Sequence, residues 1–133
     1  MKGMGKLSIN NVVRVPCKLD GKFFKYWFDF LQPLHNLTER EKEVAACYLR
    51  KRFELSQSIS DENILNKYLL SQEITKQIKE ECNLKTSHLQ VVLTKLRKNG
   101  VMIENDAINP KFIPKITQDK NSFSLLIYYD FNE

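Results

Sequence analysis

Glycine and cysteine are scarce in this chain of 133 residues, and each shortage excludes a class of site. The four glycines do not cluster, so the sequence has no glycine-rich loop that could hold a phosphate. The three cysteines, Cys17, Cys47 and Cys82, lie far apart in the sequence and form no CxxC pair. This spacing predicts free thiols in a reducing compartment rather than a disulfide framework or a metal site, and we expect no metal and no cofactor.

Long apolar runs are absent as well. No stretch approaches the roughly 18 residues that a membrane-spanning helix needs. The N-terminal sequence MKGMGKLSINN lacks the apolar centre of a signal peptide. We therefore expect a protein that is made inside the cell and has no contact with a membrane.

Catalytic groups are equally sparse. The chain has two histidines, His35 and His88, and neither has a cysteine, serine or carboxylate at a spacing that indicates a nucleophile and its base. Each is expected to be an isolated surface residue. Glu39, Glu41 and Glu43 occur at a predicted helix start, where they suit the helix dipole rather than acid–base chemistry. We predict a protein without enzymatic activity.

Positive charge is concentrated near the N-terminus. The net charge is +5, and residues 1–27 hold six basic residues against one acidic residue, Asp20. Residues 28–83 hold ten acidic and eight basic groups, and residues 84–133 hold seven basic and five acidic groups. A basic arm suits phosphate backbones and acidic protein surfaces equally, so its charge alone does not identify a partner.

Helical signals dominate the centre of the chain. Thr38 and Glu41 have the spacing of a capping box, which predicts a helix over residues 39–53. Its last turn would hold the basic residues 50–52, where the helix dipole favours cations. A second helix is predicted over residues 61–70. The residues predicted to face inward from these two helices are Val44, Ala45, Tyr48, Leu49, Ile64, Leu65, Tyr68 and Leu69.

Residues 71–100 predict two short helices joined by a tight turn. Ser71 can cap the first helix, and Asn83 interrupts the pattern as a turn. Thr86 offers its hydroxyl to the second helix, which ends at Gly100, a residue that tolerates a left-handed backbone. The apolar positions of the two helices are Ile74, Ile78, Leu89, Val92, Leu93 and Leu96.

The opposite face of the second helix is polar and basic. No acidic residue occurs between Leu84 and Gly100. At about 100° per residue, the apolar positions occupy one arc, and the remaining side chains point outward, where they could enter a DNA major groove. The outward residues predicted to contact DNA bases or phosphates are Lys85, Ser87, His88, Gln90, Val91, Thr94, Lys95, Arg97 and Lys98.

Beyond residue 100 the apolar period changes to two, which is typical of strands. Residues 101–103 predict a short strand and residues 105–106 a turn. Residues 109–114 form an extended segment in which prolines prevent full ladder pairing, and residues 118–121 a polar loop. Residues 122–131 predict the clearest strand of the chain, with alternate apolar side chains on one face.

The N-terminal region combines a strand signal with an aromatic block. Residues 12–19 alternate and precede an Asp20-Gly21 hairpin turn, but Pro16 restricts them to an edge strand. Residues 23–28 hold five aromatic side chains, and Phe30 adds a sixth. Their spacing favours a short helix over a returning strand. So much apolar area must lie in the core or in an interface, and the core is the favoured alternative.

The helix at 61–70, the helix-turn-helix and the strands that follow resemble the winged helix-turn-helix family, over roughly half of the chain. The resemblance implies a mainly α fold with a small β-wing (α+β), preceded by an N-terminal arm, a strand and an aromatic helix. Residues 1–36 would form the arm with its short strand and aromatic segment. Residues 37–133 would form the winged-helix domain, with the helix-turn-helix at 71–100 and the wing at 101–131.

A second resemblance concerns the source. The segment NNVVRVPCKLDGKFFKYWFDFLQPLHNLTEREKEV, followed by the helix-turn-helix and INPKFIP, resembles small proteins of crAss-like tailed phages of gut bacteria. It implies a structural or adaptor protein of the phage particle, such as a capsid auxiliary, connector or ring component. Such a protein would be located in the virion in multiple copies and bind other phage structural proteins. The residues predicted to contact these partners are Lys2, Lys6, Leu7, Ile9, Phe23 and Tyr26.

The alternative hypothesis is a cytoplasmic DNA-binding protein, either a transcription regulator or a replication accessory protein. It would insert the helix at 86–99 into the major groove of double-stranded DNA. Winged helices also serve as protein-docking modules, so the fold does not decide between the two functions.

Overall fold

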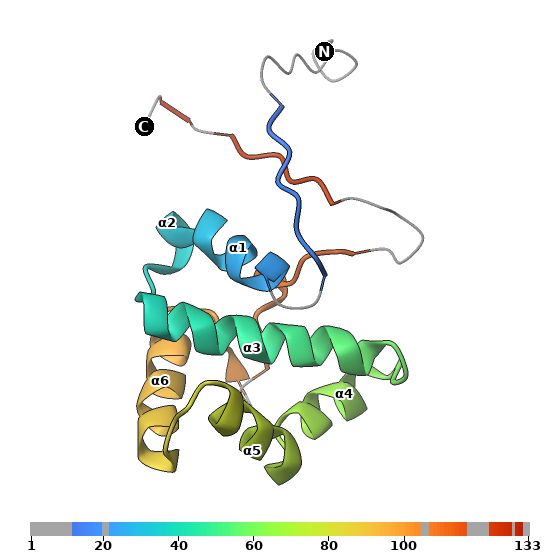
Figure 1. Cartoon of the computed structure of the whole chain (residues 1–133), viewed down its shortest axis with the longest axis vertical. Coiled ribbons are helices and arrows are strands. Elements are labelled where there is room, and N and C mark those ends of the chain that lie inside the picture. The colour runs from blue at the N-terminus through green and yellow to red at the C-terminus, as the bar shows by residue number, and fades with distance from the viewer. Residues whose placement is uncertain (1–11, 20–21, 105–106, 117–122, 129, 132–133) are drawn as a thin grey trace.

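The computed structural model describes residues 12–19, 22–104, 107–116, 123–128 and 130–131 (Figure 1). Within these residues the protein is mainly α-helical, with six α-helices, a 3-10 helix and no β-strand. The prediction of a mainly α fold is therefore confirmed. The elements in chain order are α1 (Lys22–Phe30), α2 (Gln32–His35), α3 (Glu39–Ser56), α4 (Glu62–Leu69), α5 (Gln72–Glu81), α6 (Thr86–Lys98) and the 3-10 helix η3 (Pro110–Phe112).

Helix α3 is the centre of the fold. Helix α1 packs along one side of α3, and α4, α5 and α6 contact its other side (Figure 1). The core between them is apolar, and its largest fully buried side chains include Tyr48, Phe24, Phe28 and Phe112. The helices therefore bury one continuous core around α3.

The predicted capping box starts α3. The Thr38 hydroxyl accepts a hydrogen bond from the Glu41 amide at 3.2 Å, and the Glu41 carboxylate accepts one from the Thr38 amide at 3.0 Å. These bonds satisfy backbone donors that a helix start leaves free. The helix continues to Ser56, beyond the predicted end at residue 53. Its predicted inward residues are all buried: Val44, Ala45, Tyr48 and Leu49.

The aromatic block forms α1, as predicted. Phe24, Trp27 and Phe28 are buried in the core, which confirms the core assignment for these three residues. The indole Nε1 of Trp27 donates a hydrogen bond to the Phe112 carbonyl at 2.7 Å, so the ring also satisfies a buried polar group of η3. Phe30 is exposed and is not part of the core.

Helix α4 buries a narrower face than the sequence predicts. Leu65 and Leu69 are buried, whereas Ile64 is 57% and Tyr68 is 39% exposed. The inward assignment of Ile64 and Tyr68 is therefore wrong. The eight-residue helix packs against α3 and α5, and these neighbours cover one side of it.

The predicted β-structure is not formed by the described residues. After α6, Met102 and Ile108 form one isolated antiparallel bridge, and the next segment folds into η3 rather than an extended strand. Pro110 begins η3 because its ring fixes a compatible φ and it has no amide hydrogen for a ladder. The prediction of a wing over residues 101–131 is thus wrong for the part that the structure describes. The predicted turn at 105–106 and the loop at 118–121 lie outside the described residues.

Two segments are extended without being strands. Residues 12–19, predicted as an edge strand, and the described part of residues 122–131, predicted as the clearest strand, run beyond the helices and form no ladder with the described residues (Figure 1). A segment with alternating apolar residues folds as a β-strand only when a neighbouring strand supplies hydrogen bonds. None of the described residues forms such a neighbouring strand. The predicted turn at 20–21 lies outside the described residues.

Candidate interaction surfaces

Helices α5 and α6 are two short helices joined by a tight turn, as predicted for residues 71–100. Ser71 caps α5, accepting a hydrogen bond from the Ile74 amide at 3.3 Å. At the other end, Asn83 adopts a left-handed φ of 55°. The amides of Asn83 and Leu84 then donate to the carbonyls of Glu80 at 3.3 Å and Lys79 at 2.8 Å. This pairing is a Schellman motif, which turns the chain sharply and satisfies the last carbonyls of α5.

The turn is also held from the centre of the fold. The guanidinium of Arg40 on α3 donates hydrogen bonds to the carbonyls of Cys82 and Asn83, the latter at 3.2 Å. A planar guanidinium can bind two neighbouring carbonyl oxygens at once. Arg40 therefore fixes the orientation of the turn, and with it the direction in which α6 leaves α5.

The inner face of α6 is the predicted one, because Leu89, Val92, Leu93 and Leu96 are all buried. The helix ends in a second Schellman motif around Gly100, whose φ is 78°. The Val101 amide donates to the Leu96 carbonyl at 2.9 Å, and the Gly100 amide donates to Arg97 at 3.1 Å. Local signals in the sequence are sufficient to specify this helix.

The start of α6 differs from the prediction. Lys85 is the N-cap and makes no side-chain capping bond, so the assignment of Thr86 as a cap is wrong. The Thr86 hydroxyl instead accepts a hydrogen bond from Lys79 Nζ at 3.0 Å. This bond ties the end of α5 to the start of α6.

The outer face of α6 is exposed over its full length. Within it, the Thr94 hydroxyl donates to the Gln90 carbonyl at 2.9 Å, and Arg97 donates to Thr94 at 3.3 Å. Because no carboxylate lies on this helix, its positive charge is not neutralised from within. The predicted DNA-contact residues are all exposed: Lys85, Ser87, His88, Gln90, Val91, Thr94, Lys95, Arg97 and Lys98.

The basic residues 50–52 do not lie at a helix end. Because α3 continues to Ser56, they face carboxylates of neighbouring elements. Lys51 Nζ lies 2.7 Å from Glu81, Arg50 pairs with Glu54 at 2.8 Å and also contacts Glu81, and Arg52 pairs with Glu62 at 3.3 Å. Burial raises the pKa of Glu81, but Lys51 and Arg50 lower it more, so the net pKa is below its ordinary value. The cluster joins α3 to α5 and α4 and is not an open phosphate site.

Tertiary packing brings two cysteines together. Cys47 and Cys82 are both buried, all three cysteines are free thiols, and Cys47 Sγ lies 3.4 Å from Glu81 Oε1. The hydrogen bond with Cys82 and then burial raise the pKa of the Cys47 thiol. A protonated buried thiol is a poor nucleophile and metal ligand. The sequence spacing gives no signal of this contact, since Cys47 lies on α3 and Cys82 directly follows α5.

His35 is buried, which corrects its assignment as a surface histidine. Its ring is 1% exposed, with Nε2 at 2.7 Å from the Phe28 carbonyl and Nδ1 accepting from the Leu37 amide at 3.0 Å. This arrangement requires a neutral ring that carries its proton on Nε2. Burial lowers the pKa of His35. It is therefore a satisfied core residue, while His88 is exposed as predicted.

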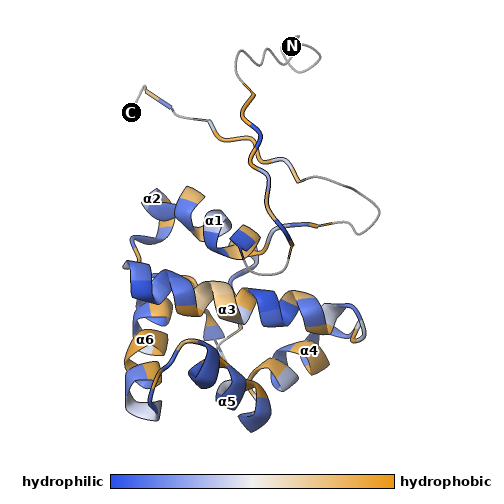
Figure 2. Ribbon diagram, viewed as in Figure 1, coloured by the Kyte–Doolittle hydropathy of each residue, from blue (hydrophilic) through white to orange (hydrophobic). Residues whose placement is uncertain are grey.

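The extended segments carry the most exposed apolar side chains. We name residues 12–19 the N-segment and residues 123–131 the C-segment, of which residue 129 is outside the described part. Val13 is 85% and Phe131 is 92% exposed. Figure 2 shows apolar residues along both segments, away from the helical core. The other large apolar residues exposed on them are Val12, Val15, Leu19, Leu125, Leu126, Ile127 and Tyr128.

The C-segment packs on α1 through its first residue, Phe123. The rings of Phe23 and Phe123 are 5.3 Å apart in an edge-to-face contact, and Trp27 lies 5.5 Å from Phe123. Phe23, predicted to contact a partner, is thus half-buried against its own chain. Tyr26, the other predicted contact on α1, is 41% exposed. The predicted partner residues Lys2, Lys6, Leu7 and Ile9 lie outside the described residues.

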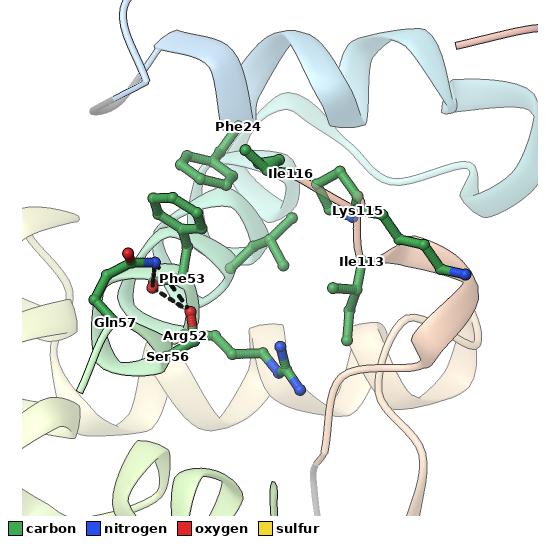
Figure 3. A pocket seen from close by; sticks show the side chains of 10 residues that line it. Phe24, Arg52, Phe53, Ser56, Gln57, Ile113, Lys115 and Ile116 are labelled. Atoms are coloured by element: carbon green, nitrogen blue, oxygen red, sulfur yellow. Dashed lines mark hydrogen bonds between the residues drawn. The ribbon is translucent and has the colours of Figure 1, made fainter. Parts of the chain in front are cut away.

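A pocket of about 200 Å³ opens between α1, the end of α3 and the segment after η3. Phe24 and Phe53 line one side and the Arg52 guanidinium lies opposite them, whereas the Lys115 ammonium points away (Figure 3). Within the described part of the chain, Arg52 Nε has no hydrogen-bond partner. Ser56 donates to the Phe53 carbonyl at 2.6 Å at the same edge. The pocket is small and mixed in polarity, and it contains no nucleophile paired with a base.

The part of the chain that the structure describes contains neither a metal-binding cluster nor a helix that could span a membrane. Among the described residues, no group of three or more histidine, cysteine or acidic side chains could hold a metal ion. None of the described helices is long and apolar enough to cross a membrane.

No family model, curated protein or solved structure matches the chain.

Proposed function

We propose that this chain is a non-enzymatic structural or adaptor protein of a phage particle, acting as a capsid auxiliary, connector or ring component. The observation that carries the proposal is the exposure of apolar side chains along the N-segment and the C-segment, with Val13 at 85% and Phe131 at 92%. The phage setting rests on the sequence resemblance to proteins of crAss-like phages. The virion is then its location, and other phage structural proteins are its partners.

The physical argument concerns the distribution of apolar area. The helical body buries its own core, and among the described residues of the two segments Phe123 alone is packed against that core. Apolar surface left in water costs about 25 cal/mol per Å², and contiguous exposed apolar patches on soluble proteins mark interaction sites. The exposed apolar side chains of the N-segment and the C-segment, which lie outside the buried core, are therefore consistent with a protein that docks on other proteins.

Within this proposal, α4, α5 and α6 are a helix-turn-helix unit of the winged-helix family used as a compact docking module. Support comes from the sharp Asn83 turn and the buried face of α6. A wing is not part of the proposal, because the described residues hold no strand after α6.

Mass spectrometry of purified phage particles tests the proposal directly. The protein should be present in many copies per particle and should stay with the particle through washing. Deleting residues 1–11 should leave the helical body folded, with a thermal transition near that of the full chain, but abolish incorporation. Absence from purified particles would contradict the proposal, and normal incorporation of the truncated protein would remove the N-terminal arm from it.

DNA binding is the second candidate function, and one observation favours it. The outer face of α6 is exposed, carries Lys95, Arg97 and Lys98 and lacks acidic residues. Such a face suits the phosphates and base edges of a major groove. In this reading the protein is a transcription regulator or a replication accessory protein in the cytoplasm.

A further inference from the structure

We propose that copies of this chain assemble with each other through β-pairing, in which the N-segment of one copy pairs with the C-segment of another. The inference rests on the proposed function and names one partner for it, a second copy of the chain. It concerns residues 12–19 and 123–131, which are apart from the helix-turn-helix.

Unpaired backbone is the first reason. Neither segment takes part in a helix, bridge or strand among the described residues. Extended backbone with free amides and carbonyls is a template for another strand, and proteins usually cover or interrupt such edges. Both segments instead add alternating apolar side chains, the pattern that makes strand addition favourable.

The attachment of both segments to α1 is the second reason. Because the ring centroids of Phe23 and Phe123 are 5.3 Å apart, the C-segment begins beside α1, the helix that follows the N-segment in the chain. If they paired only with each other, they would make a ribbon of two strands, which is marginally stable in water. A second copy supplies two more strands and can cover the apolar face.

Charge complementarity selects the pairing partner. The N-segment carries Arg14 and Lys18 and no acidic residue, whereas the C-segment carries Asp130 and no basic residue. Opposite charges on facing strands are favourable, and like charges directly opposite are unfavourable. An N-segment should therefore pair with a C-segment rather than with another N-segment.

Each copy has one N-segment and one C-segment, so it can form two such junctions. If two copies exchange segments reciprocally, the assembly closes as a dimer. If each copy passes its N-segment to the next copy, the assembly grows until a ring closes. Either form occupies both segments of every copy.

The test is the molar mass of the full-length protein, measured by size-exclusion chromatography with light scattering over a range of concentrations. Wild type should have the mass of two or more copies. Val13→Asp in the N-segment and Leu125→Asp in the C-segment should each weaken association at least about tenfold, since each places a charge on the apolar face of its segment. Both side chains are exposed in the single copy, at 85% and 42%, so the helical circular dichroism should not change.

Val91→Asp is the matched control. Val91 is an apolar residue on α6 that is 61% exposed, outside both segments. The same charge there should leave the association unchanged. A control that weakens association as much as the segment variants would overturn the proposal.

Mixing the two variants tests which segments pair. A homodimer of either variant has no intact junction, whereas a mixed dimer has one junction between a wild-type N-segment and a wild-type C-segment. Native mass spectrometry should therefore show a mixed dimer in excess of both homodimers. A mixture without this excess would overturn the pairing.

Two further outcomes would overturn self-assembly. One is a monomeric wild type up to the limit of solubility, with or without strand signal in its circular dichroism. The other is association that survives both segment variants. A monomer in solution that is nevertheless found in purified particles overturns this inference and leaves the proposed function standing. Self-assembly of a protein that is absent from particles overturns the proposed function and leaves this inference standing.

Discussion

Trp27 and Phe112, which are 85 residues apart in the sequence, are joined by a 2.7 Å hydrogen bond from the indole Nε1 to the backbone carbonyl. The bond links α1 to η3 across the core, and Phe112 is fully buried. The first helix of the body, α1, and its last element, η3, are therefore held together by this hydrogen bond.

Replacing Trp27 by phenylalanine should test this link. The variant keeps an aromatic ring but leaves the Phe112 carbonyl without a donor, which should lower the free energy of unfolding by about 1–3 kcal/mol. Urea denaturation measures the loss. Tyr26→Phe, on the 41% exposed side of the same helix, should change stability little. Equal stability of wild type and Trp27→Phe would show that the hydrogen bond contributes nothing net.

Leu93→Ala should test the buried face of α6. Leu93 is 8% exposed, so emptying its site should cost about 2–5 kcal/mol of unfolding free energy. Val91→Ala, on the outer face of the same helix, should stay within about 0.5 kcal/mol of wild type. A loss below about 1 kcal/mol for Leu93→Ala would mean that α6 is rotated from this orientation.

His35 should make stability depend on pH. Its pKa is lowered by burial from the ordinary value of 6.5, so the unfolded chain binds more protons than the folded one just below that pH. Stability is therefore fully present above pH 6.5 and falls as the pH decreases, with a slope of at most about 1.4 kcal/mol per pH unit from this group.

Denaturation at several pH values measures this slope. His35→Gln should flatten it between the two pKa values, whereas His88→Gln, on the exposed face of α6, should leave it unchanged. A slope that is the same in wild type and His35→Gln would assign the pH dependence to other groups.

The DNA hypothesis makes a prediction for Lys98. Lys98→Ala should weaken binding to duplex DNA regardless of sequence and reduce the slope of log K against log salt by about one unit, because one phosphate contact is lost. Lys22→Ala, an exposed lysine on α1, is the charge-matched control and should leave the slope unchanged. If wild type is not retained on duplex DNA at low ionic strength, the DNA hypothesis loses its main support.

The helices were predictable because their signals are local. Thr38 and Glu41 cap α3 through contacts three residues apart, and Leu89 and Leu96 share a helix face by spacing alone. The exposed polar face of α6 follows from the same periodicity. The capping residue of α6 was not predictable in this way, because Thr86 bonds to Lys79 of another helix.

The predicted strands are not formed by the described residues, because a strand needs a neighbouring strand to pair with. Residues 12–19 and 122–131 have the alternation of strands, yet the described residues place no ladder beside them. The same limit applies to side chains whose partners come from another element. Nothing local distinguishes the exposed His88 from the buried His35, which is fixed by Phe28 and Leu37.

The sequence by itself determined the mainly helical fold, the capping box, the aromatic core of α1 and the two faces of α6, since hydrophobic periodicity and capping act within a few residues. Only the tertiary structure decided that Arg40 holds the turn between α5 and α6 and that Lys51 pairs with Glu81. It also brought Cys47 and Cys82 together in the core. These contacts join residues more than 25 positions apart, and their geometry follows from how α3 packs against α5 rather than from any local pattern.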